Sequence, residues 1–127
     1  CMAELAKLEG FDWCGVYRLE GRELVLDTFV GAATGHTRIP VGRGVCGTAV
    51  AEDRDQVVED VRQLENYLAC SLETRSEAVV LIKKGGRTLG QIDIDGHSVG
   101  RFGPGEVAFL RELAALIADR WDDGPQR

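Results

Sequence analysis

The chain has 127 residues, of which 44% are hydrophobic and 28% are charged, and its formal net charge is −6. This length fits one domain with a core large enough to fold without a disulfide or a metal. An acidic surface repels phosphate backbones and anionic membranes, so we expect neither nucleic acid nor a membrane as a partner. No apolar stretch approaches the roughly 20 residues that a membrane-spanning helix needs.

The first residues, Cys1-Met2-Ala3-Glu4, lack a basic stretch followed by an apolar one, and we therefore expect no signal peptide. The four cysteines are then expected as thiols in a reducing cytoplasm. A cysteine ahead of a methionine indicates either a tag remnant or a truncated start. We expect an incomplete N-terminal helix, with Met2, Leu5 and Leu8 at helical spacing and Gly10 ending it.

Alternating apolar residues predict strands over 13–19 and 23–29, joined by a turn at 20–22. A short strand over 38–41, a helix over 45–51 and a brief strand over 56–59 follow. Residues 61–76 have weak periodicity and are predicted to form a long loop, and strands over 77–83 and 88–95 form the clearest hairpin. Pro104 begins an amphipathic helix with one apolar face, and Gly124-Pro125 ends it. That face contains Val107, Leu110, Leu113, Ala114, Ile117 and Trp121.

The order helix, hairpin, crossover, hairpin, helix predicts an α+β fold with a central antiparallel sheet and helices packed on it. We expect a single domain over residues 1–127.

The cysteines contain no CxxC motif, which excludes a thioredoxin-type motif or a paired zinc knuckle on spacing. Cys46 begins a helix after Gly42-Arg43-Gly44, where the helix dipole and a nearby arginine favour a thiolate. Cys70 ends the long loop and is free to approach another thiol. For both, a reactive thiol and a buried core thiol remain open, whereas Cys14 is expected to fill core space.

Three carboxylates form the second unusual group. Asp93 and Asp95 are two residues apart and therefore share one face of a strand, and Glu77 begins the strand paired with it. Aspartate is disfavoured in strands, so the pattern indicates either a frayed, solvated strand end or a site. Such a site would capture an ammonium group or donate a proton to an oxygen.

Two aromatic side chains, Trp13 and Tyr17, alternate on the first strand. They are expected to be core residues or the walls of an apolar pocket. His36 and His97 could join the thiols in a zinc site, but their scattered spacing argues against it, and we expect no metal.

These segments resemble the GAF-domain free methionine-(R)-sulfoxide reductases over residues 5–121, nearly the whole chain. The segment 38–49, RIPVGRGVCGTA, is the most specific part of the resemblance, together with the second cysteine 24 positions later. The other matching segments are DWCGVY at 12–17, Ala69-Cys70 with Ser76-Glu77, GQIDID at 90–95 and GRF at 100–102.

The resemblance implies a GAF-like fold and reduction of free methionine-(R)-sulfoxide. It implies that Cys70 attacks the sulfoxide sulfur and that a second thiol closes a disulfide, which thioredoxin reopens. Glu77, Asp93 and Asp95 would hold the sulfoxide oxygen and the amino group, with the two aromatic residues, Trp13 and Tyr17, around the methyl end. No cofactor is implied, and the last helix offers apolar surface for a homodimer.

One departure concerns the family's first cysteine, about ten residues before Cys46, where this chain reads Thr34-Gly35-His36-Thr37. Either Cys46 would then take the recycling role, or the enzyme would turn over poorly. Two alternatives remain, a GAF sensor that binds a small molecule and a thiol-redox sensor without catalytic turnover.

Overall fold

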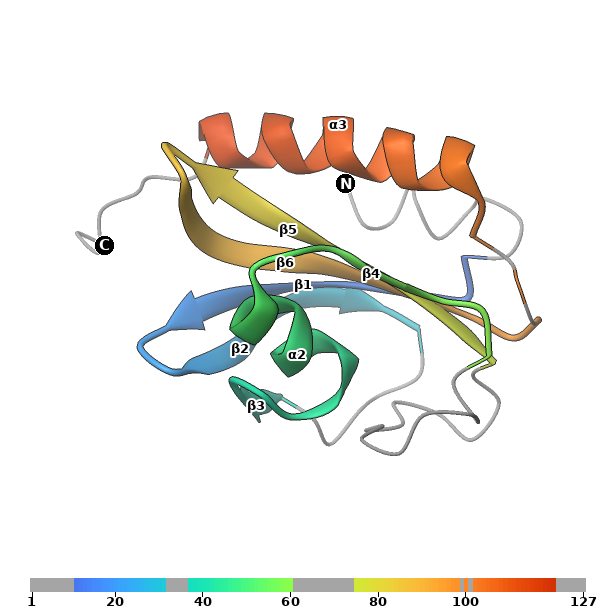
Figure 1. The fold of residues 1–127 in the computed structure, drawn as a ribbon, viewed down its shortest axis with the longest axis horizontal. Helices are drawn as coiled ribbons and strands as arrows, with labels where there is room; N and C mark the ends of the chain where they lie inside the picture. The colour runs from blue at the N-terminus through green and yellow to red at the C-terminus, as the bar shows by residue number, and fades with distance from the viewer. Residues whose placement is uncertain (1–10, 32–36, 61–74, 99, 101, 121–127) are drawn as a thin grey trace.

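The computed structural model describes residues 11–31, 37–60, 75–98, 100 and 102–120. Within these residues, six strands form one antiparallel sheet in the order β3-β2-β1-β6-β5-β4. Figure 1 shows that α2 lies on one face of this sheet and α3 on the opposite face. The elements are β1 Trp13–Glu20, β2 Glu23–Val30, β3 Arg38–Pro40, α2 Gly44–Glu52, β4 Gln56–Val58, β5 Ser76–Lys84, β6 Arg87–Gly96 and α3 Pro104–Arg120.

Both predicted hairpins and both predicted helices in this region are present, and the α+β fold class is confirmed. Most element ends differ from the prediction by one residue. Ser76 was predicted in the long loop, but it begins β5, where its hydroxyl donates to the carbonyl of Ser98 at 2.7 Å. Val41 lies outside β3, and its N–H donates to the carbonyl of Arg22. The predicted N-terminal helix, the loop over 61–74 and the segment after Arg120 lie outside the described residues.

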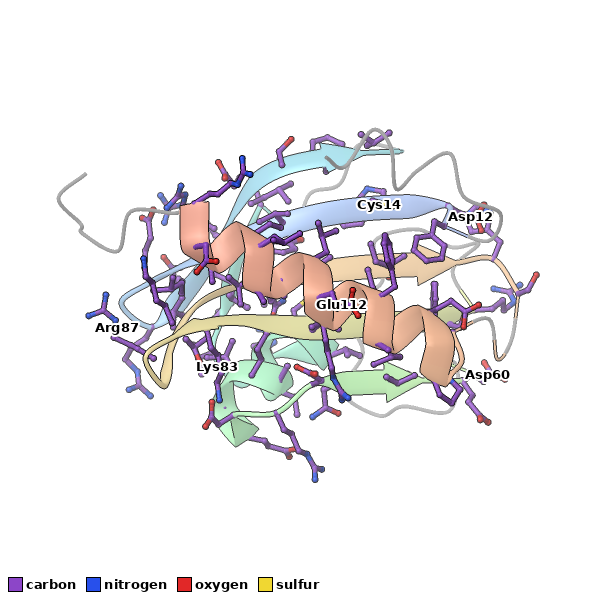
Figure 2. The ribbon with its side chains drawn as sticks, turned by 90° about the horizontal axis from the view of Figure 1, so that it is seen from above. Asp12, Cys14, Asp60, Lys83, Arg87 and Glu112 are labelled. Carbon is purple, nitrogen blue, oxygen red and sulfur yellow. The ribbon has the colours of Figure 1, made fainter. Side chains whose placement is uncertain are left out.

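The face under α3 is apolar. Cys14 and Val16 of β1 pack here with alternate residues of β5 and β6 and with Leu110 and Ala114 of α3. The predicted apolar face of this helix is confirmed within the described residues, because Val107, Leu110 and Ala114 are buried. Leu113 and Ile117 are partly buried and pack against the same core. In Figure 2, α3 crosses over the strands and Cys14 lies on β1 beside it.

The face under α2 mixes apolar and polar side chains. Its apolar part includes Trp13, Tyr17 and Val79 from the strands and Val45, Cys46 and Ala49 from α2. Its polar part consists of buried side chains that lie on alternate positions of β5 and β6, namely Glu77, Gln91, Asp93 and Asp95. This asymmetry between the two faces sets the place of the functional site.

None of the described helices is long and apolar enough to cross a membrane.

Candidate functional site

The three predicted carboxylates meet on the α2 face through strand pairing. Glu77 of β5 pairs directly with Asp95 of β6, which in turn pairs with Trp13 of β1. The next row on the same face pairs Asp93 with Gly15 on one side and with Val79 on the other. Paired residues point to the same side of a sheet, so this register brings the three carboxylates together.

These carboxylates are not at a solvated strand end. Asp93 has no exposed surface, Asp95 is 1% exposed and Glu77 is 3% exposed. Burial raises the pKa of Glu77 well above its ordinary value of 4.5, and the charges of Asp93 and Asp95 raise it further. Burial also raises the pKa of Asp93 above 3.8. A buried carboxylate without compensation is costly, so a cationic group that enters the cluster would be stabilised there.

Asp93 is the most deeply buried member of the cluster. Glu77 and Cys46 lie close enough to lower its pKa in part, opposing the effect of burial. Neither makes a hydrogen bond of good geometry to it, and among the described residues both of its carboxylate oxygens have no hydrogen-bond partner. A buried polar group of this kind indicates that something outside the described chain completes the site.

Cys46 faces the carboxylates from α2. Its Sγ donates a hydrogen bond to Oε2 of Glu77 at 3.9 Å, and both side chains are buried. The helix comes close to β3 because Gly47 has no side chain, since a Cβ there would lie 2.6 Å from the carbonyl oxygen of Pro40. The predicted position of Cys46 at a helix start is confirmed. The side chain of Arg43 is exposed, whereas the thiol is buried and faces the carboxyl group of Glu77.

The indole of Trp13 lies along its own strand over Gly15. A Cβ at Gly15 would lie 2.4 Å from the Trp13 ring, and one at Gly31 would lie 2.6 Å from the same ring. Phe29 stacks against the indole with a centroid distance of 5.7 Å and an angle of 17°. The two glycines thus leave room for a flat aromatic wall beside the carboxylates. Tyr17, on the same face, is fully buried in the α2-side core.

Gln91 is a buried polar residue of this face that the sequence analysis did not single out. It pairs with Tyr17 and with Leu81, has no exposed surface, and its amide nitrogen and oxygen have no hydrogen-bond partner among the described residues. The sequence pattern could have identified it, because Gln91 continues the two-residue spacing of Asp93 and Asp95 along β6 and therefore lies on the same face.

Of the remaining cysteines and histidines singled out in the sequence, two lie outside the described residues and two lie within them. Cys70 and His36 lie outside the described residues. Cys14 is buried on the opposite face, in the core under α3, so its expected core role is confirmed. His97 is exposed, and both its backbone N–H and its Nδ1 are near Oδ2 of Asp12. The metal-ligating atoms that the described residues bring together belong to Cys46, Glu77 and Asp93, with no histidine among them.

A separate hollow of about 460 Å³ is lined by residues of β5, of α3 and of the segment that follows α2, and none of the three carboxylates lines it. Its charged side chains are already paired, Lys83 with Asp53 at 2.8 Å and Arg111 with Asp55 at 2.7 Å. Its lining includes no thiol, so we place the candidate site at the acidic cluster.

Comparison with known proteins identifies the family to which the chain belongs. The family model of the GAF domain matches residues 1–121. The chain is 41% identical over 111 residues to the free methionine-R-sulfoxide reductase of Escherichia coli K12, covering 87% of this chain and 67% of that protein. It is 40% identical over 110 residues to the same enzyme of Saccharomyces cerevisiae, covering 84% of this chain and 61% of that protein.

A solved structure shows the same relationship in three dimensions. The free methionine-R-sulfoxide reductase of Neisseria meningitidis, in complex with its substrate, superposes with a TM-score of 0.88 at 39% identity, covering 94% of this chain and 72% of that one. The fold, the identity and the shared coverage lead to one conclusion: the chain belongs to the GAF-domain family, in the group that contains the free methionine-R-sulfoxide reductases.

Proposed function

We propose that this chain reduces free methionine-(R)-sulfoxide to methionine with its cysteine thiols. The observation that carries the proposal is the buried cluster of Glu77, Asp93 and Asp95 facing Cys46, in a chain about 40% identical to reductases of that substrate. A buried acidic cluster suits an α-ammonium group, which a methionine residue within a peptide does not have.

The carboxyl groups bind and protonate the substrate in this proposal. The ammonium of the free amino acid compensates the negative charge that burial makes costly at Asp93 and Asp95. Glu77, whose pKa is raised by burial and by the neighbouring carboxylates, is the carboxyl group that supplies a proton to the sulfoxide oxygen as the S–O bond breaks. Trp13, with Tyr17 beside it in the same core, forms the apolar wall for the methyl end.

The chemical steps balance with thiols alone. The Cys70 thiol attacks the sulfoxide sulfur, the sulfoxide oxygen is transferred to the cysteine, and the products are methionine and a Cys70 sulfenic acid. The Cys46 thiol then attacks the sulfenic sulfur, releases water and forms a Cys46–Cys70 disulfide. An external dithiol then reduces the disulfide to two thiols and is itself oxidised to a disulfide. We propose that this dithiol is thioredoxin in a reducing cytoplasm.

The test is methionine release from free methionine-(R)-sulfoxide with thioredoxin recycling. Cys70→Ser is expected to abolish release, and Cys46→Ser is expected to limit it to about one turnover per chain. Cys14→Ala is the matched control, because Cys14 lies in the core of the opposite face and should leave turnover intact. If the wild type releases no methionine even with excess dithiothreitol, the enzyme proposal is wrong.

A second candidate function follows from the segment Thr34-Gly35-His36-Thr37, which lacks the family's first cysteine. A chain without an efficient recycling thiol would act as a GAF sensor that binds the sulfoxide or responds to oxidation. Binding of the sulfoxide by calorimetry without methionine release would favour this candidate.

A further inference from the structure

We propose that Cys46, Glu77 and Asp93 form a binding site for a zinc-type divalent cation, which competes with the substrate for the same carboxylates. Metal binding is argued from the described residues alone, whereas the competition rests on the proposed function.

The geometry already approaches that of a coordination sphere. One ligand atom from each of the three side chains, the thiol sulfur and two carboxylate oxygens, lies within 4.8 Å of the others. The sulfur and the Glu77 oxygen are 3.9 Å apart. Zinc binds sulfur at about 2.3 Å and carboxylate oxygen at about 2.0–2.2 Å, which places neighbouring ligand atoms roughly 3.5 Å apart. Small rotations of the side chains therefore suffice.

The donor set selects the metal. A thiolate is a soft ligand that magnesium and calcium avoid, and two carboxylates suit a borderline ion such as Zn²⁺. Three protein ligands leave a fourth position for water, as in zinc sites that remain open. Binding replaces the thiol proton and the carboxyl protons, which pass to solvent.

Asp93 gives the independent indication of a ligand. Its side chain has no exposed surface, and both carboxylate oxygens lack a hydrogen-bond partner among the described residues. One of these oxygens belongs to the group that converges on the Cys46 sulfur. A bound cation would supply the missing partner.

Binding is tested with Cd²⁺, whose bond to a thiolate gives an ultraviolet charge-transfer band. Cys1 and Cys70 are first replaced by serine, so that Cys14 and Cys46 are the only thiols. This background and its Cys14→Ala derivative are expected to show the band at one Cd²⁺ per chain, and the Cys46→Ser derivative is expected to lose it. A band of equal strength in the Cys46→Ser derivative, or none in the background, would overturn the site.

The carboxylates are tested by competition for Zn²⁺ against a chromophoric chelator. Asp93→Asn and Glu77→Gln keep the shape of the side chains, and each is expected to weaken Zn²⁺ binding at least about tenfold. Circular dichroism confirms that the variants fold, and these two substitutions decide the question if Cys46→Ser does not fold. Unchanged affinity in both would contradict the proposal.

Competition is tested in the methionine-release assay. Zn²⁺ is expected to inhibit the wild type, excess substrate to relieve the inhibition and a chelator to restore the full rate. Bound Zn²⁺ that leaves turnover unaffected would refute the competition. If the protein binds Cd²⁺ but releases no methionine, the metal site stands and the reductase proposal is wrong. If it releases methionine but does not bind Cd²⁺, the reductase proposal stands and the metal site is wrong.

Discussion

The ring of Trp13 lies so close above Gly15 that a Cβ on the glycine would come within 2.4 Å of it. The two residues are neighbours on one face of β1, and Gly15 pairs with Asp93. Gly15 therefore determines the position of the aromatic wall relative to the carboxylates, although it offers no side chain of its own.

Gly15→Ala is expected to displace the indole and to destabilise the fold by about 1–3 kcal/mol, the usual cost of overpacking a core. For the proposed reductase, the displaced wall should raise KM more than it lowers kcat. Thermal unfolding and steady-state kinetics measure both effects. Gly105→Ala is the matched control, because no atom lies within 4 Å of a Cβ there and the residue is in α3. An unchanged KM in Gly15→Ala would refute the role of Trp13 as a pocket wall.

Asp95→Asn removes one buried negative charge next to Glu77 while keeping the size of the side chain. If the carboxylates hold the substrate ammonium, kcat/KM for free methionine-(R)-sulfoxide should fall about 10- to 100-fold, which is the effect of a lost charged hydrogen bond. The wild type should reject the N-acetylated substrate, and the variant should discriminate less between the two substrates. Equal discrimination by wild type and variant would show that Asp95 does not recognise the ammonium.

The thiol of Cys14 is expected to be inert. Burial, together with the charges of Asp93, Asp95 and Asp12, raises its pKa from 9.0 to about 12. At pH 8, the thiolate fraction is then about a thousandfold lower than for an ordinary cysteine. Labelling with iodoacetamide and mass spectrometry should find Cys14 unmodified in the native protein and modified in urea.

The same pKa predicts a loss of stability at alkaline pH. The unfolded chain loses the Cys14 proton near pH 9, whereas the folded chain keeps it until about pH 12. The unfolded state therefore binds fewer protons in this window, and the free energy of unfolding falls as the pH rises through it. Cys14→Ala should flatten this part of the pH dependence measured by urea unfolding. A slope identical to that of the wild type would contradict the prediction.

Gln91→Leu is expected to stabilise the protein. The amide is fully buried without a hydrogen-bond partner among the described residues, and such a group costs about 1–3 kcal/mol. Leucine of similar size removes that cost and packs against Tyr17 and Leu81. Gln91→Glu, which places a further acid beside the cluster, should instead destabilise. Urea unfolding measures both, and a destabilised Gln91→Leu would indicate that the amide has a partner such as a bound water.

Asp55 connects the sheet edge to α3. One carboxylate oxygen accepts the N–H of Leu81 at 2.8 Å, and the other binds Nε of Arg111 at 2.7 Å. Asp55→Ala leaves a strand N–H without its partner and should cost about 1–3 kcal/mol, whereas Arg111→Ala breaks only a surface pair and should cost about 1 kcal/mol or less. Chemical unfolding of both variants should give this order, and equal costs would refute it.

The sequence predicted the α+β class and the ends of most elements to within one residue, because these follow from local signals. The turn at 20–22, the turn at 84–87 and Pro104 mark where strands and helices begin and end. The two-residue spacing of Asp93 and Asp95 also sufficed to place them on one face, since the side chains of a strand alternate. The family resemblance, which rests on the segments around Cys46 and Cys70, indicated the identity of the proposed substrate. The local patterns alone do not identify it.

Only the tertiary structure decided whether that face is solvated or buried. The carboxylates could equally have lain at a frayed strand end, and they form a site because α2 covers them and because strand pairing sets Glu77 opposite Asp95. Cys46 and Glu77 are 31 positions apart, so their contact depends on how α2 packs, as does the burial of Gln91. Local pattern fixes which way a side chain points, but the charge state and reactivity of that side chain depend on what covers it, and residues distant in the chain provide that cover.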